Sequence, residues 1–218
     1  MDEIKLIDVR QNILADNQNQ AEAIRQRLAA RGIFMVNVMA SPGAGKTSLI
    51  IQTIRRLQKQ LRIAVIEGDI ESWVDAEKVK AEGIPAVQIR TGGACHLDAP
   101  MITAALDSLD LDTIDLVFVE NIGNLICPAE FDIGANLSVM ILSIPEGDDK
   151  ILKYPLMFSI SDVLLVNKVD YLEGSDFDLA RLRQRASELN PGLKIHEISC
   201  KTGAGLEPWA GWLLSQVE

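Results

Sequence analysis

Short runs of apolar residues alternate along the chain with segments in which apolar residues recur every three or four positions. The runs have the length of buried strands and lie at 34–39, 63–67, 86–89, 114–119, 138–144, 162–166 and 194–198. The segments between them predict helices at 47–60, 75–82, 99–109, 177–189 and from 206 onward, after a first amphipathic helix at 11–30. This alternation predicts an α/β fold, with a mostly parallel sheet and helices on both of its faces.

The length and charge of the chain narrow the class of protein. Its 218 residues suit one domain with an amino-terminal addition, so we expect a helical extension at 1–31 packed on a domain at 32–218. A net charge of −10 argues against a nucleic-acid partner. No apolar run approaches the ~20 residues of a membrane span, and no leader pattern is seen, so we expect a cytoplasmic protein without membrane contact. In that compartment, three cysteines favour ligands or core thiols over disulfides.

A phosphate-binding loop is predicted between the first long strand and its helix. The stretch A-S-P-G-A-G-K-T, ending at Thr47, matches the P-loop pattern except that Ala40 replaces the first glycine. The residues expected to contact the nucleotide are Gly43, Ala44, Gly45, Lys46, Thr47 and Ser48. Backbone N–H groups would hold the β-phosphate, Lys46 would bridge the β- and γ-phosphates, and the Thr47 hydroxyl would bind Mg²⁺.

A second motif predicts recognition of guanine. Asn167-Lys168-Val169-Asp170 follows the strand at 162–166, where a ligand would bind in an open α/β sheet. The Asp170 carboxylate can accept hydrogen bonds from N1–H and the exocyclic amine of guanine, which adenine does not offer, and the Lys168 stem would pack over the ring. The loop Ser199-Cys200-Lys201 resembles the S-A-K loop that supports the base in GTPases. We therefore expect GTP and GDP as ligands, with hydrolysis of GTP.

Acidic residues at two strand ends predict the magnesium site. Asp69 ends the strand after the P-loop helix, and Glu120 begins an E-x-x-G sequence that ends at Gly123, the expected γ-phosphate sensor. Thr47, Asp69 and Glu120 are the candidate Mg²⁺ ligands, Asp69 directly or through water. The candidate catalytic residues are Lys46, Asp69, Asp75 and Glu120. Asp75 would either place the attacking water or cap the helix that begins there.

Two cysteines and a histidine predict a second metal site. Cys95 and His96 follow one predicted strand and Cys127 follows another, so the carboxyl edge of a parallel sheet would bring them together. Two thiolates and an imidazole suit Zn²⁺ or Ni²⁺, although adjacent Cys and His can both bind only if the backbone bends. Three ligands do not complete a tetrahedron, whereas a two-fold dimer would contribute four thiolates. The alternative is that both cysteines are small buried apolar residues.

Three segments together resemble one family. They are T-G-G-A-C-H-L-D-A from Thr91, E-N-I-G-N-L-I-C-P-A from Glu120 and D-K-I-L-K-Y-P from Asp149, and they are similar to the hydrogenase nickel-incorporation GTPases, HypB. The resemblance implies a P-loop GTPase of the SIMIBI class that dimerises with GTP. It also implies nickel delivery to the [NiFe]-hydrogenase large-subunit precursor, with a small nickel-binding partner of the HypA type.

The resemblance assigns roles to individual residues and leaves alternatives. The family's metal ligands fall on Cys95, His96 and Cys127, and its lysine that reaches the neighbouring subunit's nucleotide falls on Lys153. One alternative is the related urease nickel-insertion GTPase, which places Cys, Pro and His together, unlike this chain. Another is a nucleotide-gated interaction protein in which a zinc ion is purely structural.

Overall fold

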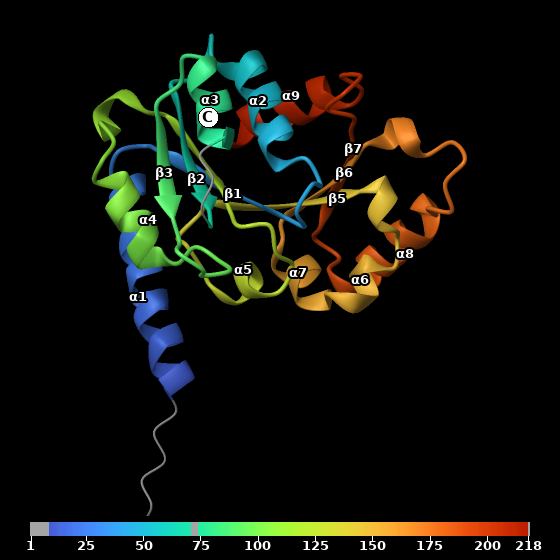
Figure 1. The fold of residues 1–218 in the computed structure, drawn as a ribbon, viewed down its shortest axis with the longest axis horizontal. Helices are drawn as coiled ribbons and strands as arrows, with labels where there is room; N and C mark the ends of the chain where they lie inside the picture. Colours follow the sequence, from blue (N-terminus) through green and yellow to red (C-terminus); the bar gives the residue numbers. More distant parts are fainter. Residues whose placement is uncertain (1–8, 71–73, 218) are drawn as a thin grey trace, which may run out of the picture.

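Seven parallel strands form one sheet in the computed structural model, which describes residues 9–70 and 74–217, with side chains described for 14–70 and 77–217 (Figure 1). The strands are β1 (Phe34–Ala40), β2 (Ile63–Asp69), β3 (Ala86–Arg90), β4 (Leu116–Glu120), β5 (Leu137–Ser143), β6 (Val163–Asn167) and β7 (Lys194–Glu197). Their order across the sheet is β3-β2-β4-β1-β5-β6-β7. The predicted α/β class is therefore confirmed, and each predicted strand is present to within a few residues.

Helices cover both faces of this sheet. One face carries α2 (Lys46–Leu57), α3 (Val74–Ala81) and α9 (Leu206–Val217). The other carries α1 (Val9–Ala29) and α4 (Ala99–Leu106) beside α6 (Lys150–Lys153), α7 (Pro155–Ile160) and α8 (Leu179–Leu189). A further short helix, α5 (Cys127–Glu130), lies beside α7 (Figure 1).

The central strand shows how the sequence builds these two layers. Side chains alternate across a strand, so Val36 and Val38 point into the core under α2 and α9, while Met35 faces the core under α1 and α4. The last helix is tied to the P-loop helix by a buried hydrogen bond, 3.0 Å long, from Trp209 Nε1 to Thr53 Oγ1. Helices packed on both faces of the sheet therefore stabilise β1, the strand that leads into the phosphate loop.

The amino-terminal helix shares a core with the rest of the molecule. Ile24 and Leu28 of α1 are buried with Met35 of β1 and Ile102 of α4. Figure 1 shows α1 running alongside α4 and continuing past the sheet. The helix predicted at 11–30 is confirmed, whereas the division of the chain at residues 31 and 32 stays a prediction.

The strand order places a ligand site at β1. From β1 the chain passes over β4 to β2, continues to the edge strand β3 and returns to β4. It then crosses β1 and continues on the other side through β5, β6 and β7. The strand order therefore reverses at the carboxyl end of β1, and open α/β sheets bind ligands at such a point. The predicted P-loop begins at Ala40, the last residue of β1.

Candidate nucleotide and metal site

The phosphate loop and the base motif are locked together. Gly45 precedes α2 with φ of 109°, and a Cβ atom there would lie 2.4 Å from Asn167 Nδ2, so glycine is needed for both conformation and space. The Asn167 amide donates to the Ala44 carbonyl at 2.9 Å and accepts from Lys168 and Cys200 N–H. This side chain joins the ends of β1, β6 and β7.

A cavity of about 500 Å³ lies between these segments. Its lining residues are Gly43, Gly45, Ser48, Pro145, Asn167, Lys168, Asp170, Tyr171, Cys200 and Lys201. Lys168 has a left-handed backbone, and its ammonium donates to the Gly43 carbonyl at 2.8 Å, so its stem spans from the base motif to the P-loop. The sequence analysis named all of this lining except Pro145 and Tyr171.

The Asp170 carboxylate is held as an acceptor at one end of this cavity. The Ser199 hydroxyl donates to Asp170 Oδ1 at 2.6 Å, and the Lys201 ammonium lies 3.7 Å from Oδ2. The Ser199 hydrogen bond is the main cause of a lowered pKa for Asp170. The carboxylate is therefore ionised near neutral pH, the form that can accept two hydrogen bonds. Burial raises the pKa of the neighbouring Cys200 thiol to about 11, which makes it unreactive.

A second cavity, of about 320 Å³, lies on the other side of the P-loop. Residues that line it include Pro42, Gly43, Lys46, Glu67, Asp69, Glu120 and Gly123. The Thr47 hydroxyl donates to Glu120 Oε1 at 2.9 Å, which brings two of the three predicted magnesium ligands together. Asp69 borders the same cavity, and these oxygen donors fit the preference of Mg²⁺. A Cβ atom at Gly123 would lie 3.0 Å from Pro42, so glycine lets the E-x-x-G turn approach the P-loop.

The sequence analysis missed one acidic residue that lines this cavity, Glu67. Glu67 on β2 is opposite Glu120 on β4 in register, and both are buried. The available signal was a glutamate near the end of an otherwise apolar strand. Asp75 falls in the first turn of α3, but its side chain lies outside the described residues, so its two alternatives remain open.

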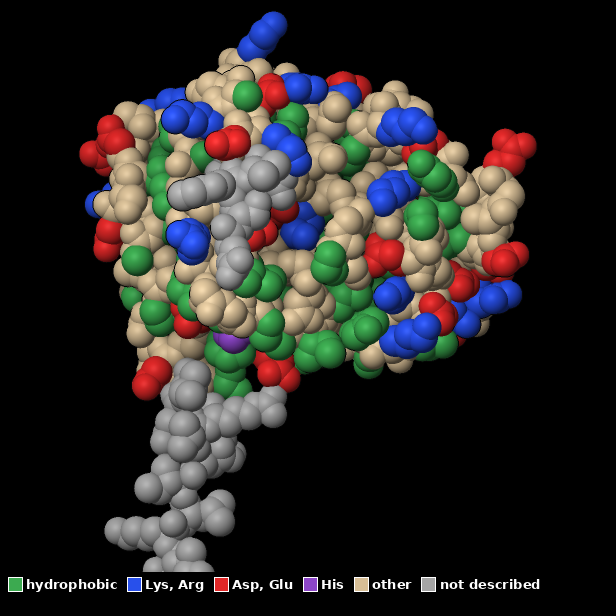
Figure 2. Space-filling model, viewed as in Figure 1, with side chains coloured by type: hydrophobic (Ala, Val, Ile, Leu, Met, Phe, Trp, Pro, Cys, Tyr) green, Lys and Arg blue, Asp and Glu red, His purple; other side chains and the backbone are tan. Residues whose placement is uncertain are grey.

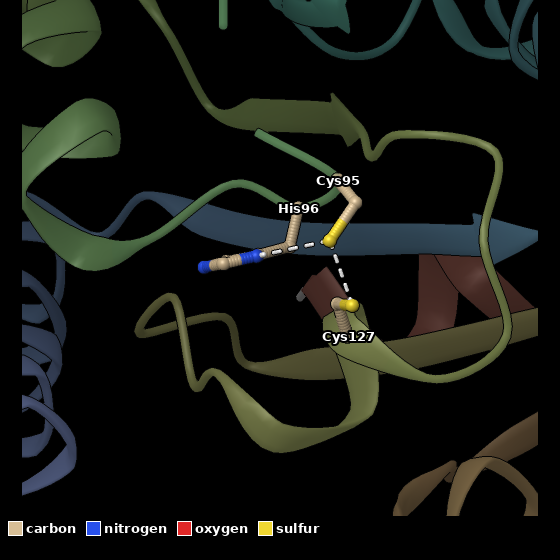
Figure 3. A group of neighbouring side chains, drawn as sticks. All are labelled: Cys95, His96 and Cys127. Carbon is tan, nitrogen blue, oxygen red and sulfur yellow. Dashed lines mark hydrogen bonds between the residues drawn. The ribbon is translucent and has the colours of Figure 1, made fainter. Parts of the chain in front are cut away.

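The sulfur and imidazole ligands meet at the same sheet edge (Figure 3). Cys95 Sγ lies 2.7 Å from Cys127 Sγ and 3.9 Å from His96 Nδ1, and potential ligand atoms of the three residues all lie within 4.8 Å of one another. Cys95 is exposed and Cys127 half-buried, so the alternative of two buried apolar residues is wrong. A tetrahedral ion with Zn–S bonds of about 2.3 Å separates its sulfurs by roughly 3.7 Å, so a bound ion would push these thiols apart.

Neighbouring side chains set the orientation and the pKa values of the potential metal ligands. The His96 ring stacks on Phe131, with centroids 3.8 Å apart. Burial lowers the pKa of His96, against the opposing effect of the Asp98 and Glu130 carboxylates, and so favours the neutral imidazole that binds metals. The pKa of the Cys95 thiol is raised, mainly because this thiol donates a hydrogen bond to Cys127.

Asparagine side chains connect the metal cluster to the phosphate site. Asn121, next to Glu120 and fully buried, accepts from the Leu97 N–H at 3.2 Å and donates to Asn37 Oδ1 at 3.1 Å. Asn124 donates to the Cys95 carbonyl at 3.2 Å. The E-x-x-G segment is therefore bonded directly to the loop of Cys95 and His96, a connection that the sequence analysis did not predict.

Lys153 does not line either nucleotide cavity of its own chain. It lies on α6, exposed, with its ammonium 2.5 Å from Asp149 Oδ2. An exposed position outside its own site is compatible with contact to a neighbour, and that role stays a prediction.

The sheet order, the P-loop and the base motif define a P-loop nucleoside triphosphatase, whose fold supports nucleotide hydrolysis. The family model described as "CobW/HypB/UreG, nucleotide-binding domain" matches residues 34–197. The chain belongs to the HypB family of hydrogenase maturation factors.

Two similar HypB proteins and one protein that shares only the fold give the extent of the similarity. The hydrogenase maturation factor HypB of Escherichia coli strain K12 is 44% identical over 216 residues, which cover 99% of this chain and 74% of that protein. The crystal structure of Helicobacter pylori HypB in complex with nickel has a TM-score of 0.88 and 35% identity, over 93% of this chain and 95% of that one. FlhF complexed with GMPPNP and Mg²⁺ has a TM-score of 0.55 and 17% identity, over 83% and 74% of the two chains, and shows the fold alone. None of the helices in the described part of the chain is long and apolar enough to cross a membrane.

Proposed function

We propose that this chain is a magnesium-dependent GTPase that carries nickel during the maturation of [NiFe]-hydrogenase. The observation that carries the proposal is the Cys95–His96–Cys127 cluster, bonded through Asn121 and Asn124 to the segment that begins at Glu120. The Escherichia coli relative is named a hydrogenase maturation factor, and the Helicobacter pylori relative was crystallised with nickel.

The nucleotide chemistry of the proposal rests on named groups. Asp170 selects guanine, because its ionised carboxylate borders the larger cavity. Thr47 and Glu120 hold Mg²⁺ with Asp69, while Lys46 stabilises charge on the β- and γ-phosphates. The magnesium ion neutralises the developing phosphate charge when bound.

The metal of the cluster is cargo in this proposal. The donor set of two thiols and one imidazole accepts Ni²⁺ or Zn²⁺. Binding of the γ-phosphate would shift the segment from Glu120 to Gly123, and the asparagine bonds would pass that shift to the Cys95 loop. The recipients would be the hydrogenase large-subunit precursor and a small nickel-binding partner of the HypA type.

An exposed apolar surface supports the homodimer of this proposal. We call it the α5–α7 patch; it consists of Ile126, Leu152, Leu156 and Ile160. Figure 2 shows hydrophobic side chains gathered along the lower edge of this view, over α5 and α7. Ile126 immediately precedes Cys127, so a second copy that covered the patch would bring its own thiols to the cluster.

The proposal is tested by titrating the reduced chain with nickel and with zinc, in GDP and in a non-hydrolysable GTP analogue, while light scattering follows the mass. We expect the GTP-analogue form to dimerise and to gain a tighter metal site. A metal affinity that is the same with both nucleotides would instead support the structural-zinc alternative.

The α5–α7 patch gives a separate prediction. Leu156→Asp places a charge on a side chain that is 47% exposed, and it should prevent dimerisation of the GTP-analogue form without changing GTP affinity. Gln216→Asp is the matched control, because it adds the same charge at an exposed position of α9 across the sheet. Analytical ultracentrifugation of both variants measures the effect. An unchanged dimer in Leu156→Asp would remove the patch from the interface.

A further inference from the structure

We propose that Asn17, on helix α1, is a positioning residue for the metal centre, an inference that rests on the metal site of the proposed function. Its side chain is 5% exposed and joins two distant segments. The amide nitrogen donates to the Asp132 carbonyl at 2.7 Å, and the amide oxygen accepts from the Ala99 N–H at 2.8 Å. One of these segments follows Cys95 and His96, and the other follows Cys127.

The bond to Ala99 anchors the first ligand loop. Ala99 is the first residue of α4, and the leading N–H groups of a helix have no acceptor within it. Asp98 accepts from Met101 as the cap, and Asn17 accepts from Ala99. The beginning of α4, and with it the adjoining Cys95–His96 loop, is thereby fastened to α1.

The bond to Asp132 anchors the second ligand segment. Asp132 follows Phe131, the residue whose ring stacks on the His96 imidazole. A hydrogen bond to the Asp132 carbonyl therefore restrains Phe131 and, through the stacked rings, the orientation of His96. The Asp132 carboxylate is also bound to α1, by an ion pair with Arg25 and by Gln18 at 3.2 Å.

The amide group suits this task because it offers an acceptor and donors within one small planar group. Residues that orient metal ligands without binding the metal affect affinity by about 10- to 100-fold when they are replaced. Asn17 lines neither nucleotide cavity, so its effect is expected at the metal site and not on the GTPase reaction itself.

The experiment compares nickel binding by the full chain and three variants in the presence of GDP. Binding is followed through the thiolate-to-nickel charge-transfer absorption. Asn17→Ala should bind nickel about 10- to 100-fold more weakly and shift the absorption band. Asn17→Asp, which keeps the acceptor for Ala99 but loses the donor to Asp132, should also bind nickel more weakly than the native chain.

Gln18→Ala is the matched control, because it removes an exposed bond from the same helix to the same Asp132. It should keep the native nickel affinity, and all three variants should keep the native rate of GTP hydrolysis without nickel. If Asn17→Ala does not fold, as judged by thermal melting, Asn17→Asp decides the question.

Two results would overturn the inference alone. One is native nickel affinity and absorption in both Asn17 variants while Cys127→Ala loses nickel, which leaves the proposed function standing. The other is an equal loss of nickel affinity in Gln18→Ala, which would mean that α1 stabilises this region in general and that Asn17 has no specific role. Absence of nickel binding by the native chain would overturn the proposed function and this inference with it.

Discussion

Replacing Asp170 with asparagine is expected to lower the affinity for GTP by about 10⁴-fold and to create affinity for xanthosine triphosphate. The native carboxylate presents two acceptors to the N1–H and amine of guanine. An asparagine amide presents one donor and one acceptor, which matches a base with a carbonyl oxygen in place of the amine. Titration with fluorescent derivatives of both nucleotides measures the exchange.

The control for this prediction is Asp176→Asn, which removes an equal charge from an exposed residue outside the cavity lining. It should bind GTP as the native chain does. Native GTP affinity in Asp170→Asn would mean that guanine is recognised by other groups of the cavity.

Replacing Cys127 with alanine is expected to weaken nickel binding by about 10²- to 10³-fold, since one thiolate supplies roughly a quarter of the binding free energy of a four-ligand site. Cys95 and His96 alone leave the ion with fewer strong donors and more water. The charge-transfer absorption of the nickel complex should fall accordingly, and competition with a chelator of known affinity measures the loss.

The third cysteine is a natural control for this prediction. Cys200 is half-buried in the base loop, and its thiol is protonated because burial raises its pKa to about 11. Cys200→Ala should therefore keep nickel binding. Equal losses in the Cys127 and Cys200 variants would point to oxidation or unfolding instead of a specific ligand.

Much of the fold was predictable because its signals are local. The apolar runs from Phe34 and Leu116 identify buried strands by themselves, and the P-loop is one continuous stretch of sequence. The helices α5, α6 and α7 were not predicted, because four to six residues are too few to show a helical period.

In the candidate site, only the residues that belong to sequence motifs were predictable. Strand ends indicated that Cys95 and Cys127 would meet, and the structure brings their sulfurs together. The side chains that connect the motifs, Asn17 and Asn121, gave no signal because the backbone N–H groups that they bind between the motifs are distant in sequence. Individual roles for the site residues remain predictions that the variants above would test.

The central position of β1 has a consequence for how the chain folds during synthesis. Its neighbours are β4 and β5, so Phe34 must wait for Leu116 before it can pair. At about 5–20 residues per second, the first strand would leave the ribosome roughly 4–16 seconds before its partner. Pairing between such distant segments also slows folding, so we expect the newly made apolar strand to need protection by a chaperone until β4 arrives.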